Sequence, residues 1–270
     1  MNEHLSDVPM DIRRRSPRRR GMWMLVPLVA GFLILFVFSQ RWKDSLRIER
    51  LVVEGARIIP AQEIFQAAGV APRSPMYGID VFEVREQVMK YPFFKSVTVN
   101  RKYPNALCIQ VVEREPVACI NTGQVWYVDV EGVVLPHIQS PVKFDLPMIS
   151  GIDGNQLAKE GQLLQNKDVF EAIQILQNAQ AVDTALYHLI SEVNMNKGGD
   201  IVLYSSDAGA PILLGRGDFL KKLMMLQTFW KNFVKAADAE NLRYVDLRFN
   251  DQVVVKWDQS GESQPVKLTM

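Results

Sequence analysis

Residues suited to redox and metal chemistry are scarce in this sequence. Of its 270 residues, two are cysteine and three are histidine. Two cysteines are too few for a fold that depends on disulfides. Cys108 and Cys119 are eleven residues apart in chain that we predict to be extended, so their Cα atoms could lie up to about 36 Å apart, whereas a disulfide needs about 7 Å or less. We therefore predict two separate thiols.

Motifs of common enzyme classes are also missing. His4, His137 and His188 match no spaced metal-binding set, and His188 falls on a predicted strand, where we expect it at the surface or the core edge. The sequence contains no GxSxG or GxxxxGK pattern. We predict no enzyme activity, metal, cofactor or small-molecule substrate. Paired carboxylates for glycan hydrolysis stay open, because one sequence does not show which acidic residues meet.

One glycine-rich turn has two interpretations. Gly215-Arg216-Gly217-Asp218 precedes a predicted helix, whose first backbone N–H groups could bind an anion. The dinucleotide-binding pattern fails because residue 220 is leucine. We favour a tight strand-to-helix turn in which Asp218 caps the helix.

Most of the chain has no large excess of positive or negative charge. The formal net charge is +1, and residues 1–20 contribute +3 from six arginines and three acidic residues, which leaves −2 for the rest. A nearly neutral body has no field that would attract nucleic acid. Non-specific electrostatics therefore does not select the partners of this chain.

The sequence does contain one long apolar run, from Met22 to Ser39. As a helix it would be about 27 Å long, close to the hydrocarbon thickness of a bilayer, and no charged residue interrupts it. Arginines 13–15 and 18–20 precede it, so the positive-inside tendency places residues 1–20 in the cytoplasm and the chain after Arg41 on the far side. We predict a single-pass membrane protein.

Three alternatives compete with a membrane anchor. A signal peptide cleaved after Ser39 is disfavoured because the apolar run is longer than the usual 7–15 residues or so and stays apolar up to the cleavage position. A buried helix of a soluble domain would show a polar face, which this run lacks. The arginines could bind nucleic acid, but beside an apolar span their topological role is sufficient.

The fold class predicted beyond the anchor is α+β, in two domains. Residues 47–116 alternate as strand, helix, helix, strand, strand, so the helices can cover one face of a small sheet. Residues 117–258 form a larger, mostly antiparallel β domain with two helices, joined stiffly to the first, and residues 259–270 a frayed tail. The predicted strands span 48–54, 94–103, 106–115, 117–120, 124–130, 133–135, 186–196, 200–204, 211–214, 242–249 and 252–257, and the predicted helices begin near Pro60, Asp80, Asn166 and Asp218.

The last of these helices carries a predicted buried stripe, which consists of Leu220, Leu223, Met224, Gln227, Trp230, Phe233 and Ala237.

The last two predicted strands suggest a binding site. If Val253 to Trp257 is the last strand, its outer side is an unpaired edge to which an extended partner can add. Phe249 and Trp257 would anchor that partner, and Arg248 or Lys256 would pair with its acidic groups. The alternative is an ordinary hairpin whose edge is shielded by the tail.

Several segments together resemble the FtsQ/DivIB family of bacterial cell-division proteins. A basic tail and one span precede Leu51-Val52-Val53-Glu54-Gly55, which is similar to the first strand of the family's POTRA domain. The stretch from Val111 to Ala118 is similar to the passage into its β domain, and Leu214 to Asp218 and Tyr244 to Arg248 follow in the family's order. The resemblance covers nearly the whole chain.

The resemblance implies a non-enzymatic divisome scaffold in the cell inner membrane, with its bulk periplasmic and located at the septum. The POTRA domain would help recruitment, and the β domain would bind FtsB and FtsL, two small bitopic coiled-coil proteins. A membrane-tethered wall hydrolase is the alternative, and a role in polypeptide transport lacks the barrel strands it needs. The sequence has lysine at 256, where the family can use a small residue. The implied partner-binding residues are Lys197, Tyr244, Arg248, Phe249, Val253, Val254, Val255, Lys256 and Trp257.

Overall fold

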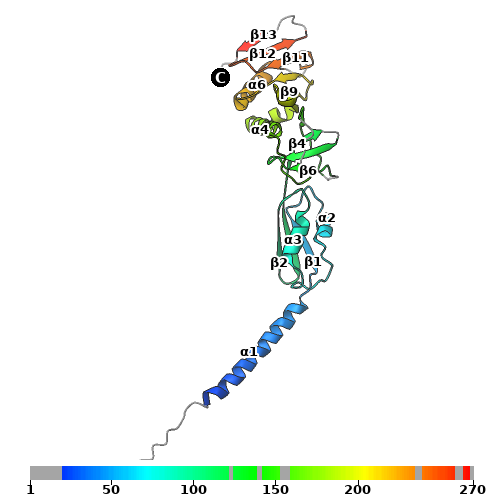
Figure 1. Cartoon of the computed structure of the whole chain (residues 1–270), viewed down its shortest axis with the longest axis vertical. Helices are drawn as coiled ribbons and strands as arrows, with labels where there is room; N and C mark the ends of the chain where they lie inside the picture. The colour runs from blue at the N-terminus through cyan, green and yellow to red at the C-terminus, as the bar shows by residue number, and fades with distance from the viewer. Residues whose placement is uncertain are drawn as a thin grey trace, which may run out of the picture.

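One long helix leads into two domains arranged end to end (Figure 1). The computed structural model describes residues 20–121, 124–138, 142–152, 159–234, 239–258 and 264–267. Helix α1, Arg20–Ser45, contains a 19-residue stretch, Leu25–Lys43, that is long and apolar enough to cross a membrane and is not buried by any other part of the structure. The α1 helix extends beyond the predicted span at both ends, and its interior includes Pro27.

The first domain has the predicted order of strand, helix, helix, strand, strand. It consists of β1 (Arg50–Glu54), α2 (Ala61–Ala68), α3 (Val81–Met89), β2 (Phe94–Lys102) and β3 (Ala106–Glu113). The sheet order is β1-β3-β2, with β1 parallel and β2 antiparallel to the central β3. Because β1 and β3 are parallel, the β2–β3 turn lies at the end of the domain where β1 begins, next to α1 (Figure 1).

Local sequence signals set the boundaries of the two short helices. The Asp80 side chain accepts a hydrogen bond from the Phe82 backbone N–H at 2.8 Å and so caps α3. Gly69 ends α2 in the left-handed region at φ 62°. At Gly55, with φ 89°, an added Cβ would lie 2.1 Å from the Val111 carbonyl oxygen, so only glycine fits there.

The two faces of this sheet differ in chemistry. Residues from both helices pack on one face and bury Ile64, Val88 and Ile109. On the other face, the Glu54 carboxylate accepts hydrogen bonds from Gln110 Nε2 at 2.8 Å and Lys102 Nζ at 2.6 Å. These hydrogen bonds lower the pKa of Glu54 from its usual 4.5 to about 2, because they stabilise the ionised form.

The lowered pKa of Glu54 makes the stability of the first domain depend on pH. A carboxyl whose pKa is depressed on folding stabilises the fold above its unfolded pKa of about 4.5, and this contribution is lost as the pH falls toward 2. We expect Glu54→Gln to unfold at lower urea concentration than the parent at pH 7, with the difference shrinking as the pH falls below about 4.5 and closing only below about pH 2. Gln110→Ala, which removes one of these hydrogen bonds, should make the stability of the protein depend less on pH between about 4.5 and 2. A difference that stays constant across this range would contradict the assignment.

Both cysteines are free thiols, as predicted. Cys108 is fully buried in β3, and Cys119 lies partly buried in β4 (Pro116–Asn121). Burial raises the pKa of both thiols, so each stays protonated near neutral pH.

A buried ion pair links the two domains. Arg114 lies between β3 and β4, and its Nη1 contacts Asp129 Oδ2 at 2.6 Å and Glu131 Oε2 at 2.7 Å in the turn after β5 (Val125–Asp129). Lys95 of β2 also contacts Glu131, at 2.5 Å. Tyr127 and Leu135 of the second domain pack into the core of the first. The joint is therefore formed by side chains as well as by the connecting chain.

The second domain is built on a ten-stranded mixed sheet. The sheet order is β13-β12-β11-β10-β9-β8-β7-β4-β5-β6, and three neighbouring pairs, β4–β7, β7–β8 and β10–β11, are parallel. Helices α4 and α6 pack against each other and share one core with the strands. The remaining elements are β6 (Val134–Leu135), β7 (Met148–Ser150), α4 (Lys167–Val182), α5 (Thr184–Leu189), β8 (Ile190–Asn194), β9 (Val202–Ser205), β10 (Pro211–Leu213), α6 (Phe219–Phe233), β11 (Leu242–Asp246), β12 (Gln252–Trp257) and β13 (Gln264–Lys267), with short 3₁₀ turns at Asn196–Gly198 and Ala239–Asn241.

The starts of two helices in this domain differ from the sequence predictions. The predicted strand 186–196 is divided, because the Asp183 side chain accepts a hydrogen bond from the Ala185 N–H and starts α5 before β8 begins. His188 therefore lies on a helix, where it is exposed. Asp218 does not cap α6 through its side chain and instead has a left-handed backbone at φ 50°.

The buried face of α6 also differs from the predicted stripe. Leu223 is fully buried as predicted, but Leu220 and Met224 are about half exposed. Residue 237 lies outside the described residues. The face that packs on the sheet consists of Phe219, Leu223, Met225, Leu226 and Phe229.

The expected open edge of β12 is covered in this structure. Strand β13 pairs with it antiparallel, with Val253 opposite Val266 and Val255 opposite Gln264. The prediction of a frayed tail is thus wrong for residues 264–267. The alternative, a hairpin shielded by the tail, describes this edge better.

Candidate partner-binding edge

The predicted partner-binding residues gather at the end of the molecule that is farthest from α1. Strands β11, β12 and β13 lie there side by side (Figure 1). Tyr244 of β11 is paired with Lys256 of β12, and Leu242 with Trp257. The structure therefore places the predicted site residues of β11 and β12 on two paired strands of one hairpin.

Side chains of β12 alternate between the core and the opposite face. Val253 and Val255 are buried, with exposed fractions of 0% and 2%, whereas Val254 and Lys256 are only partly buried. The two buried valines fix the register of β12, because a shift by one residue would bury Lys256 instead. The strand thus presents its outer backbone edge in a defined position, and β13 occupies that edge.

Arg248 is already paired within the chain. Its Nη2 contacts Asp246 Oδ2 at 2.7 Å, and its Nη1 contacts Asp200 Oδ2 at 2.9 Å. Burial opposes ionisation of Asp246, but the hydrogen bonds from the Arg248 side chain and backbone outweigh it and lower the pKa of this carboxyl. Arg248 therefore holds the end of β11 to the chain before β9. Its pairing with an acidic group of a partner stays a prediction, and such a group would have to share or replace these contacts.

The two proposed aromatic anchors differ in exposure. Phe249 follows β11 and is 48% exposed. Trp257, at the end of β12, is partly buried and packs against the core of the second domain. Phe249 is available to a partner, whereas Trp257 also supports the fold.

Lys197 lies in the turn between β8 and β9. The residue is exposed, has a left-handed backbone at φ 47°, and its N–H donates to the Gly151 carbonyl at 2.6 Å. Asp200, three residues later, accepts the hydrogen bond from Arg248. Sequence reasoning missed Asp200 and Asp246, although the spacing of Asp246 and Arg248 two residues apart at a strand end was visible.

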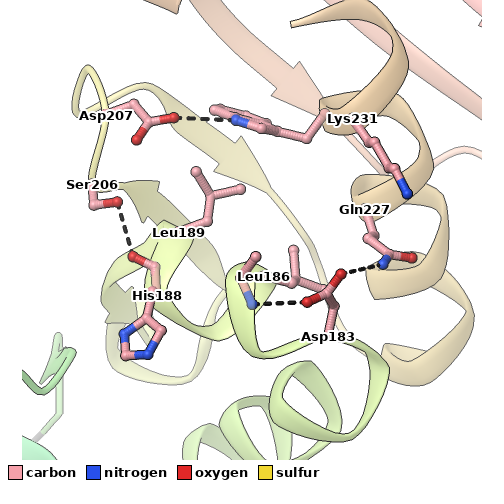
Figure 2. Close-up of a pocket in the computed structure, with 10 residues that line it drawn as sticks. Asp183, Leu186, His188, Leu189, Ser206, Asp207, Gln227 and Lys231 are labelled. Carbon is pink, nitrogen blue, oxygen red and sulfur yellow. Dashed lines mark hydrogen bonds between the residues drawn. The ribbon is translucent and has the colours of Figure 1, made fainter. Parts of the chain in front are cut away.

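A separate cavity of about 580 Å³ lies between α5, the β9–β10 turn and α6. Figure 2 shows that its polar side chains are joined to one another across these elements. Asp183 accepts hydrogen bonds from the Ala185 N–H at 2.9 Å and from Gln227 Nε2 at 2.8 Å, which lower its pKa, and Asp207 accepts one from Trp230 Nε1 at 3.3 Å. In the part of the chain that the structure describes, no group of three His, Cys, Asp or Glu side chains could hold a metal ion.

Comparison with known proteins places both domains. A family model of the FtsQ-type POTRA domain matches residues 46–114, and a model described as FtsQ/DivIB, C-terminal related, matches residues 115–256. The chain belongs to the FtsQ/DivIB family. The β-α-α-β-β domain is accordingly its POTRA domain.

Curated relatives are similar over most of the chain, and each is named cell division protein FtsQ. The relative from Geotalea daltonii is 34% identical over 212 residues, which cover 78% of this chain and 75% of the relative. The one from Geobacter sp. strain M21 is 32% identical, covering 87% and 81%, and that from Rhodothermus marinus is 29% identical, covering 93% and 92%. This chain is therefore a cell-division protein of the FtsQ/DivIB family.

Proposed function

We propose that this chain is a non-enzymatic scaffold of the divisome in the cell inner membrane, with residues 1–20 cytoplasmic and both domains periplasmic at the septum. Helix α1 anchors it, and the second domain captures a strand of the FtsB and FtsL pair. Membrane anchoring raises the effective concentration of partners that are themselves anchored in the same membrane. Binding, rather than a chemical reaction, is then what both domains provide.

The observation that carries this proposal is the β12 edge. Its register is fixed by Val253 and Val255, and the strand on its outer side, β13, contributes only four residues. A partner strand placed there gains main-chain hydrogen bonds along β12 without any change in the core.

We propose that the partner strand replaces β13 and does not add outside it. Pro265 of β13 stands opposite Val254. Proline has no N–H to donate, so it weakens either the pairing with β12 or any further strand added beyond β13. A partner strand without proline can form the more complete ladder with β12.

Phe249→Ala is the substitution that tests this site most cleanly. Because Phe249 is about half exposed, we expect normal folding and about tenfold weaker capture of purified FtsB/FtsL, corresponding to loss of one aromatic contact. Binding is measured by biolayer interferometry with the full-length chain in detergent. The matched control is Phe82→Ala, an exposed phenylalanine of the POTRA domain, which should bind like the parent. Parent-like affinity of Phe249→Ala would remove this residue from the site.

A further inference from the structure

The POTRA domain is attached directly to the end of α1. Helix α1 ends at Ser45, and β1 begins at Arg50. The connecting residues are held by backbone hydrogen bonds from the Met76 N–H to the Leu46 carbonyl at 2.9 Å and from the Ile48 N–H to the Ser74 carbonyl at 3.0 Å. The loop around Tyr77 is therefore fixed beside the last turn of α1.

The length of α1 places this loop at the level of the lipid headgroups. Lys43 lies four residues beyond Ser39, the end of the apolar run, which corresponds to a rise of about 6 Å. The headgroup layer on each side of a bilayer is about 5–7 Å thick. The Lys43 Nζ atom lies 6.0 Å from the centre of the Tyr77 ring, so this ring is at headgroup depth when residues 22–39 fill the hydrocarbon.

Exposed aromatic side chains gather at this end of the domain. Trp42, Tyr77 and Tyr103 have exposed fractions of 65%, 40% and 66%. The hydroxyl groups of the two tyrosines are hydrogen-bonded to each other, which joins the Tyr77 loop to the β2–β3 turn. Arg101 fixes the pair, because its guanidinium lies 5.6 Å from the Tyr77 ring centre and donates to the Met76 carbonyl at 2.9 Å.

Basic residues are in excess in the chain segments next to these rings. Residues 41–50 together with Arg73 contain five basic residues and two acidic residues, Asp44 and Glu49, an excess of three positive charges. Glu49 accepts a hydrogen bond from Asn105. The five basic residues are Arg41, Lys43, Arg47, Arg50 and Arg73, all exposed.

We propose that Trp42, Tyr77, Tyr103 and the five basic residues form a docking surface for anionic phospholipid headgroups, which holds the POTRA domain against the bilayer. Tyrosine and tryptophan favour the membrane–water interface, and each basic residue near an anionic surface gains about 1 kcal/mol. The inference rests on the proposed function only in that α1 spans the membrane. A docked POTRA domain gives the rest of the molecule a defined direction away from the membrane.

Hydrogen exchange of the full-length chain in lipid nanodiscs tests this surface. Peptides that cover residues 73–79 and 101–106 should exchange at least about threefold more slowly in discs with anionic phosphatidylglycerol than in discs of phosphatidylcholine alone. The difference should shrink in 0.5 M salt, because screening weakens the attraction. Peptides of α2 and α3 should exchange equally in both kinds of disc.

Two variants test the contributions of the basic residues and of the tyrosine rings separately. For each variant, hydrogen exchange in anionic discs is compared with exchange of the same variant in phosphatidylcholine discs. Arg47→Gln/Arg73→Gln should strongly reduce the lipid dependence, because it lowers the excess of positive charge from three to one, and Tyr77→Ser/Tyr103→Ser should also reduce it. The control Arg57→Gln/Lys90→Gln removes the same charge elsewhere on the domain and should behave like the parent. Equal exchange of the parent in both lipids would overturn the docking surface. Undiminished FtsB/FtsL capture would then leave the proposed function intact, whereas failure to enter the discs would reject both.

Discussion

A chain that ends at Asp258 is expected to bind FtsB/FtsL about tenfold more tightly than the full-length chain. The truncation removes β13, which covers β12 along Gln252–Val255. If the edge is open only one tenth of the time, the observed dissociation constant is tenfold higher than that of the open form. A tenfold change corresponds to about 1.4 kcal/mol, a plausible net stability for four paired residues after the entropy of ordering them.

A substitution that strengthens the pairing of β13 with β12 should weaken partner binding. Pro265→Val restores the missing backbone N–H of β13 and favours a strand conformation, so β13 should compete better for β12. We expect affinity below that of the parent for this variant and above it for the truncated chain. Tighter binding by the truncated chain and weaker binding by Pro265→Val would together show that β13 and the partner strand compete for β12. A general effect of the tail would not change the affinity in opposite directions.

Titration of both variants and the parent with purified FtsB/FtsL, by the interferometry used for Phe249→Ala, measures this prediction. A chain whose residues 264–267 are replaced by Gly-Ser-Gly-Ser controls for tail length and should bind like the truncated chain. Equal dissociation constants for all four proteins would show that β13 does not compete with the partner. Weaker binding after truncation would show instead that β13 is part of the binding surface.

Arg114→Ala is expected to lower the free energy of unfolding by about 3 kcal/mol and to loosen the joint between the domains. The Arg114 and Asp129 side chains are 17% and 3% exposed. Without Arg114, the Asp129 carboxylate keeps the backbone N–H groups of Glu131 and Val133 but loses its counter-charge in a buried position. Removing one member of a buried pair typically costs about 3–5 kcal/mol, and the remaining hydrogen bonds place this case at the lower end.

Thermal or urea unfolding of the full-length chain measures this loss, and small-angle scattering measures the angle and spread of the two domains. The matched control is Arg57→Ala, which removes an exposed ion pair with Glu115 near the same joint and should cost less than about 1 kcal/mol. An Arg114→Ala protein as stable as this control, with an unchanged scattering profile, would show that the packing of Tyr127 and Leu135 alone holds the joint.

Much of the fold could be predicted from short-range patterns. The order of the POTRA elements follows from alternating apolar residues, the Asp80 cap and the Gly69 end of α2, all of which act within a few residues. The α1 span follows from the absence of charge over the apolar run. Asn166 likewise caps α4, accepting from the Asp168 N–H at 2.9 Å.

Errors arose where the pattern did not distinguish between competing structures. The apolar residues from Leu186 to Met195 fit a strand as well as a helix followed by a strand, and the Asp183 cap decides between them. On α6, apolar residues surround most of the helix, so the sequence did not identify the face that packs on the sheet. Packing against α4 and the strands selected Phe219, Leu226 and Phe229.

The β11–β12 hairpin shows the same division most clearly. Sequence patterns by themselves determined the membrane anchor, the two-domain α+β organisation and the β11–β12 hairpin, because periodicity and turns are local properties. Only the tertiary structure decided that Arg248 binds Asp200, that Trp257 packs against the core, and that residues 264–267 cover β12. These contacts join segments distant along the chain or weak in strand signal, and their energies exist only once the sheet brings the segments together.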